Sequence, residues 1–95
     1  MSRARQGQPL DVYQVEVWYQ PPDRGDDAPL RWRTYGRAGL VEAVESVDWE
    51  VRTVRAFEGT VERLPATVTD EPIEVYRRRS RFWVETDGRW RYVED

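Results

Sequence analysis

Alternation of apolar and polar residues is the clearest signal near the start of the chain. Between residues 11 and 20, tyrosine and valine alternate with polar side chains until a pair of prolines interrupts the pattern. A period of two is typical of a β-strand, and proline cannot donate to a sheet ladder. We therefore predict a first strand at 11–20, a loop at 20–29 and a second, antiparallel strand at 30–35.

A helical repeat follows the second strand. Leu40, Val44 and Val47 recur at spacings of four and three residues, while two glutamates between them fall on the opposite side. This spacing places the apolar residues on one face of a helix. We predict a helix at about 36–47, entered through a sharp turn that Gly36 and Gly39 permit.

The rest of the chain has the pattern of strands separated by tight turns. Glu58-Gly59 and Asp87-Gly88 are the two turn signals, and the second is the stronger because a type I′ hairpin needs positive φ at both central residues. The predicted strands are 49–57, 60–64, 73–86 and 89–93.

These elements predict an α+β fold in the order β-β-α-β-β-β-β. One helix covering one face of a mostly antiparallel sheet of about five to six strands is the economical arrangement. Residues 1–9 hold little that is apolar, and we expect a disordered lead-in there. Residues 10–95 are then expected to form a single α+β domain.

The residue types that are missing limit the chemistry. The chain has no cysteine and no histidine, so thiol and histidine-based nucleophiles and classical zinc sites are excluded. Residues 23–27 gather three acids around a glycine but lack the ligand spacing of a calcium loop, and we interpret them as a solvated turn. We predict no enzyme activity, no cofactor and no metal.

Composition also bears on location and source. No apolar run reaches the length of a membrane span, so we expect a cytoplasmic protein that binds no membrane. All fifteen basic residues are arginine, and lysine and asparagine are both absent. This bias is typical of a high-GC genome and indicates a bacterium or archaeon of that kind, or one of their viruses such as a phage.

Arginines interleaved with aromatic residues form the candidate binding surface. The pattern occurs at 31–35, 77–83 and 89–92, whereas residues 41–75 hold nine acids against three arginines. Arginine, tryptophan and tyrosine are enriched at the centres of protein interfaces. The predicted partner-binding residues are Arg31, Arg33, Arg77, Arg79, Arg81 and Trp83.

We therefore predict a small protein-binding domain, such as an adaptor, inhibitor or phage accessory protein, that acts through this sheet surface or through the acidic side of the helix. The alternative is a single-stranded nucleic-acid-binding protein, since arginine and aromatic rings also stack on bases. The net charge of −3 weighs against it. A homodimer formed through an edge strand is a further expectation.

Two local resemblances accompany these patterns. Residues 80–93, Ser-Arg-Phe-Trp-Val-Glu-Thr-Asp-Gly-Arg-Trp-Arg-Tyr-Val, resemble the closing hairpin of NTF2-like domains. That resemblance implies a small-molecule pocket protein, which ranks last among the functions considered. Residues 13–54 are similar to small proteins of actinobacteria and their phages.

Overall fold

The computed structural model describes residues 10–24, 28–65 and 70–93. It has the α+β fold and the order β-β-α-β-β-β-β that the sequence predicts. The elements are β1 (Val12–Trp18), β2 (Leu30–Tyr35), α1 (Gly36–Arg52), β3 (Glu58–Arg63), β4 (Ile73–Arg79), β5 (Trp83–Thr86) and β6 (Arg89–Tyr92). The disordered lead-in predicted at 1–9 lies outside the described residues.

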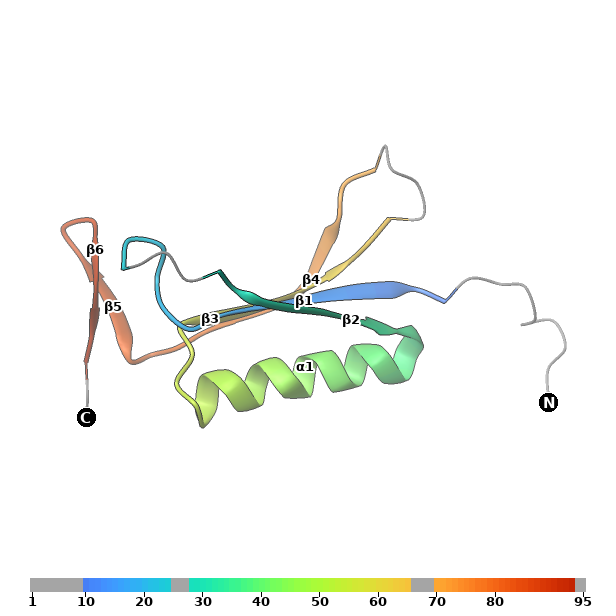
Figure 1. Ribbon diagram of the computed structural model, residues 1–95, viewed down its shortest axis with the longest axis horizontal. Helices are drawn as coiled ribbons and strands as arrows, with labels where there is room; N and C mark the ends of the chain where they lie inside the picture. Colours follow the sequence, from blue (N-terminus) through green and yellow to red (C-terminus); the bar gives the residue numbers. More distant parts are fainter. Residues whose placement is uncertain (1–9, 25–27, 66–69, 94–95) are drawn as a thin grey trace, which may run out of the picture.

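The six strands divide between two antiparallel sheets. The main sheet has the order β2-β1-β3-β4, and α1 lies along one of its faces (Figure 1). Strands β5 and β6 form a separate two-stranded sheet at the end of the molecule where α1 ends (Figure 1). Strands β2 and β4 are therefore the outer strands of the main sheet, and each has one open edge within the described part of the chain.

The core lies between the main sheet and α1. The alternation predicted for the first strand is confirmed, because its odd-numbered residues Tyr13, Val15 and Val17 are buried and its even-numbered ones are only half-buried. They pack against residues of α1 that recur every four positions. Gly59 of β3 permits the closest approach, since a Cβ placed there would lie 2.5 Å from Cγ1 of Val47.

The predicted end of the helix is wrong. Helix α1 continues to Arg52, so the strand predicted at 49–57 does not form. Val47 and Val51 are both buried, and they extend the four-residue repeat of the helix beyond its expected end. Their β-branched side chains also suit a strand, which is why local preference was misleading.

The predicted turn at Glu58-Gly59 is also wrong, because both residues belong to β3. The chain instead reverses between α1 and β3, where Arg55 has a φ of 64°. The long strand predicted at 73–86 is interrupted after β4. There the hydroxyl of Ser80 accepts a hydrogen bond of 3.0 Å from the amide of Phe82, and β5 begins one residue later.

The hairpin turn at Asp87-Gly88 is confirmed. Thr86 pairs with Arg89 across it, and the two turn residues have φ values of 54° and 77°. Both values are positive, as a type I′ turn requires. Gly36, at the junction between β2 and α1, also has a positive φ of 71°, which explains a glycine at the sharp turn predicted there.

Candidate functional site

Four of the six predicted binding residues lie on the sheet face that α1 leaves uncovered. Side chains alternate between faces along a strand, and Val15 of β1 points toward the helix. Its partner across β2 is Trp32, so Arg31 and Arg33 on either side of Trp32 point the other way. The same alternation places Arg77 and Arg79 of β4 on the uncovered face, beside Thr60 and Glu58 of β3.

Acidic residues on the central strands neutralise most of these arginines. Arg31 lies 2.6 Å from a carboxylate oxygen of Glu16 in β1. Arg77 and Arg79 both contact Glu58 in β3, at 2.9 and 2.6 Å. The uncovered face is therefore a lattice of ion pairs rather than a basic surface.

Glu58 is the centre of this lattice. Its side chain is only 11% exposed, yet its carboxylate accepts hydrogen bonds from Arg77 at 2.9 Å and from Arg79 at 2.7 Å. A second hydrogen bond, from Arg77 to Glu74, and then the charge of Glu58 raise the pKa of Arg77. Arg33 makes no hydrogen bond or ion pair with any described residue, which distinguishes it from these arginines.

Trp83 lies apart from this lattice, in an aromatic cluster that attaches the β5–β6 hairpin. Its ring centroid is 5.3 Å from that of Tyr92 and 6.2 Å from that of Phe57, both in edge-to-face geometry. Phe57 in turn packs 4.8 Å from Trp90. An unbroken strand at 73–86 would place Arg77, Arg79, Arg81 and Trp83 on one face. The break between β4 and β5 separates Trp83 from the arginines of β4.

Four arginines border the aromatic cluster, and two of them, Arg79 and Arg81, are predicted binding residues. The guanidinium of Arg79 lies 4.9 Å from the ring centroid of Trp90, and that of Arg81 lies 5.2 Å from the ring centroid of Phe82. Such contacts are typical cation–π geometry and stabilise the attachment of the hairpin. Arg79 thus connects the aromatic cluster to the ion-pair lattice, whereas Trp83 is half-buried within the cluster.

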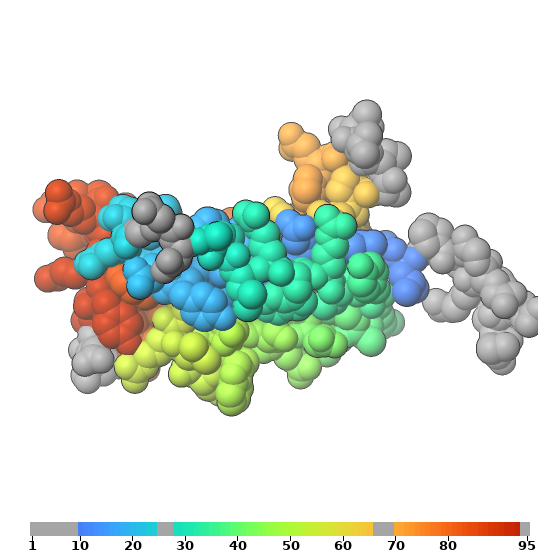
Figure 2. All heavy atoms as spheres, viewed as in Figure 1, coloured from blue at the N-terminus to red at the C-terminus, as the bar shows by residue number. Residues whose placement is uncertain are grey.

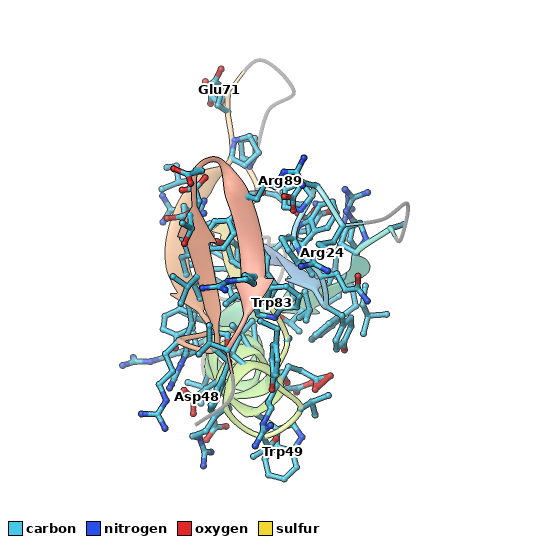
Figure 3. The ribbon with its side chains drawn as sticks, turned by 90° about the vertical axis from the view of Figure 1, so that its left-hand side faces the viewer. Arg24, Asp48, Trp49, Glu71, Trp83 and Arg89 are labelled. Carbon is cyan, nitrogen blue, oxygen red and sulfur yellow. The ribbon has the colours of Figure 1, made fainter. Side chains whose placement is uncertain are left out.

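A polar hollow of about 920 Å³ lies between the hairpin and the loop after β1. Arg24 donates to the carbonyl oxygen of Trp90 at 3.1 Å, and Asp23 accepts from the amide of Trp90 at 3.2 Å. Figure 3 shows Arg24 beside Trp83, and its guanidinium lies 5.8 Å from the centroid of that ring. These interactions hold the loop against the hairpin.

A groove that the sequence did not indicate runs between α1 and β2. It is a shallow depression of about 590 Å³ that is open to solvent, and its lining is more apolar than polar. Its lining residues are Leu30, Trp32, Glu42, Glu45, Ser46, Trp49 and Glu50. On the face seen in Figure 2, the atoms of β2 lie directly above those of α1.

The apolar part of the groove is unusually accessible. Trp49 is 57% exposed and Leu30 is 50% exposed, while Trp32 is half-buried between them and the core. Figure 3 shows Trp49 projecting outward from α1. The sequence missed this site because Trp49 was assigned to a strand, and only the longer helix places it one turn after Glu45.

Three glutamates border the groove, and they are not equivalent. Glu50 accepts a hydrogen bond of 2.6 Å from the hydroxyl of Tyr19. Burial, followed by this hydrogen bond and the charge of Glu50, raises the pKa of Tyr19 to about 12. Glu42 and Glu45 make no hydrogen bond or ion pair within the described part of the chain, so their charges are available to a ligand.

Comparison with protein-family models, with curated proteins and with solved structures finds no match. Within residues 10–24, 28–65 and 70–93, no cluster of carboxylates has the composition of a metal site. The acidic turn considered at 23–27 lies partly outside these residues. Over the same described residues, no helix is long and apolar enough to span a membrane.

Proposed function

We propose that this chain is a small, non-enzymatic protein-binding domain whose binding surface centres on the groove between α1 and β2. The observation that carries the proposal is the exposure of Trp49 and Leu30 beside Trp32 in one groove. A buried aromatic anchor surrounded by a polar rim is the usual composition of a protein-interface hot spot. The absence of histidine and cysteine supports a binding role rather than a catalytic one.

Under this proposal, the predicted arginines of β2 and those of β4 have different roles. Arg31 and Arg33 lie on β2 and point to the sheet face opposite the groove. A partner that extends along the edge of this strand would contact them on that face. Arg77 and Arg79 lie at the opposite edge, and we assign them to the stability of the sheet. The arginine-only composition and the absence of cysteine support a cytoplasmic location in a high-GC bacterium or its phage.

Nucleic acid is the less favoured partner. Affinity for a phosphate backbone comes from cations that release counterions, and Arg31, Arg77 and Arg79 are already paired with glutamates. The groove itself is bordered by acids, which would repel phosphates. These charges favour a protein ligand.

The test compares two variants that remove one exposed apolar side chain from the same helix. Trp49→Ser removes the groove anchor, whereas Val41→Ser removes a side chain that is 53% exposed and does not line the groove. Proteins captured from cells that carry the gene should be retained by wild type and Val41→Ser and lost by Trp49→Ser. Purified partner should bind Trp49→Ser at least about tenfold more weakly, as expected for an interface anchor.

Two results would contradict the proposal. The first is a set of captured proteins that does not change with Trp49→Ser. The second is tight, salt-dependent binding of a single-stranded oligonucleotide by wild type, which would assign the surface to nucleic acid.

A further inference from the structure

Within the described part of the chain, the outer edge of β2 carries backbone groups without a sheet partner. The amide of Gly36 donates to the carbonyl oxygen of Asp11 at 2.8 Å. This bond shows which residues of β2 exchange hydrogen bonds with β1. In an antiparallel ladder every second residue exchanges hydrogen bonds with the neighbouring strand, and the residues between point their N–H and C=O groups outward. Arg31, Arg33 and Tyr35 therefore point these groups away from β1.

A strand added at this edge would lie directly beside the groove. Neighbouring strands are about 4.8 Å apart, and their side chains alternate between the two faces. On the helix side, the added side chains would meet Trp32 and Trp49, with Glu42 and Glu45 at the border. On the uncovered side, they would lie next to the row of arginines on β2.

We propose that the edge of β2 binds an extended segment of a partner protein by strand addition. The segment presents apolar and basic side chains toward α1 and acidic or polar side chains toward Arg33 on the other face. Charge complementarity carries this assignment, because Glu42 and Glu45 on one side and Arg33 on the other have no partner among the described residues. The inference rests on the proposed protein-binding function and specifies the chemistry of the partner.

A second copy of the chain is a poorer occupant. An antiparallel β2–β2 contact would bring Arg31 and Arg33 next to the same arginines of the other copy, and like charges facing each other across strands are destabilising. Pairing of β2 with β4 would bring them next to Arg77 and Arg79. A foreign segment avoids both conflicts.

The first experiment selects peptides on the full-length protein from a displayed library of random ten-residue segments. We expect enrichment of sequences in which apolar or basic residues alternate with acidic or polar ones. Three results would overturn the inference: enrichment of acidic sequences, enrichment of sequences whose apolar residues are spaced three and four apart as in a helix, or no enrichment.

The second experiment tests strand pairing without altering the protein. The best enriched peptide is synthesised with N-methyl groups at alternate residues, in two versions that differ by one position. One version should bind about tenfold more weakly or worse because it cannot donate to β2, and the other should bind like the parent peptide. Equal affinities for the two versions would overturn strand addition.

The third experiment tests the charges. Glu42→Gln/Glu45→Gln should weaken binding of the peptide by about threefold to tenfold at low salt, as expected for two exposed ion pairs. The matched control Glu62→Gln/Glu85→Gln makes the same change in net charge away from the groove and should leave the affinity unchanged. Equal effects of the two double variants would overturn the basic character of the partner.

The partner protein separates this inference from the proposed function. A purified partner that depends on Trp49 but is not displaced by the peptide would leave the protein-binding function in place and overturn strand addition. A partner whose affinity is unchanged by Trp49→Ser would overturn both the proposed function and strand addition. Light scattering that shows a dimer dissociated by the peptide would instead assign the edge of β2 to a second copy.

Discussion

The two outer strands of the main sheet use arginine in different ways. On β4, Arg77 and Arg79 share the nearly buried carboxylate of Glu58, and Arg78 on the other face pairs with Asp48 of α1. On β2, Arg31 is paired whereas Arg33 has no partner among the described residues, and the same is true of Glu42 and Glu45 in the neighbouring groove. One outer strand has its charges satisfied internally, and the other does not.

This difference shows that an arginine count does not identify a binding surface. The arginines of β4 contribute chiefly to holding the strands together, because a guanidinium that is already bonded to a carboxylate has less to offer a ligand. The edge of β2 combines unpaired charge, exposed tryptophan and free backbone groups.

Gly59→Ala is expected to have the largest effect. The new methyl group would meet Val47 and push α1 away from the sheet, and such overpacking costs about 1–3 kcal/mol of unfolding free energy. Since α1 forms one wall of the groove, ligand binding at β2 should weaken, whereas the ion pairs on the opposite face should persist. Chemical denaturation and peptide affinity measure the two effects.

Val47→Ala provides the control for that prediction. The double variant Gly59→Ala/Val47→Ala should be less destabilised than the sum of the two single variants, because the added methyl group occupies space that the valine has left. Strict additivity would contradict the proposed contact between Gly59 and α1.

Glu58→Gln should have the next largest effect. It removes the carboxylate shared by Arg77 and Arg79, and loss of a partly buried, charge-assisted interaction costs about 1–3 kcal/mol of unfolding free energy. The released guanidinium groups should also give the β4 edge measurable affinity for a single-stranded oligonucleotide at low salt.

Glu62→Gln is the matched control for Glu58→Gln, since it changes a half-buried glutamate on the same face of β3. It should have a much smaller effect on stability. Equal destabilisation by the two variants would mean that the β4 arginines are not held by Glu58 in particular, and the contrast between the two edges would be lost.

Asp48→Asn should have a small effect. Asp48 pairs with Arg78 of β4 and with Arg52 one turn along the helix, but both arginines are more than a third exposed. Exposed ion pairs contribute about 0.2–1 kcal/mol, and salt screens them. We expect a loss of that size in low salt that largely disappears in concentrated salt. A loss that is the same at both salt concentrations would contradict an electrostatic role.

The smallest expected effect on stability comes from the hydrogen bond between Tyr19 and Glu50. The pKa of Tyr19 is raised from 10.0 to about 12 by burial and by Glu50, so the folded state holds this proton more tightly than the unfolded state. The stability that results is complete below pH 10 and is lost as the pH rises toward 12. Absorbance titration should show one late-titrating tyrosine that is absent from Tyr19→Phe.

Glu50→Gln should lower the pKa of Tyr19 without returning it fully to 10.0, since burial is the largest cause of the shift. An unchanged titration in this variant would show that Glu50 is as free as Glu42. All three groove acids would then be available to a ligand.

Local signals in the sequence predicted some elements well. The alternation in β1 and the Asp87-Gly88 turn depend on residues close together in the chain, so both are readable without the rest of the fold. The end of α1 was missed because Val47 and Val51 suit either a helix or a strand locally. Their burial under β1 and β3 decides between the two, and no local pattern carries that information.

The candidate site shows the same division. Strand alternation, a local rule, places Arg31 and Arg33 on one side of their strand and Arg77 and Arg79 on one side of theirs. Only the pairing of the strands brings both pairs to the same face of the main sheet. Whether their guanidinium groups are free to bind a ligand was not predictable, since strand pairing alone brings Glu16 and Glu58 within reach of them. The groove was missed altogether, because its two tryptophans come from β2 and α1 and meet only once the helix has packed.

Four features can therefore be read from the amino-acid sequence alone: the class of the fold, the order of its elements, the closing hairpin and the lack of thiol and imidazole side chains. Periodicity, turn geometry and residue types need no distant contacts to be read. Four others emerge only when the chain has packed: the end of α1, the identity of the outermost strands, the neutralisation of particular arginines and the groove beside β2. These features depend on contacts between residues far apart in the chain, and packing and charge pairing between them settle what remains exposed.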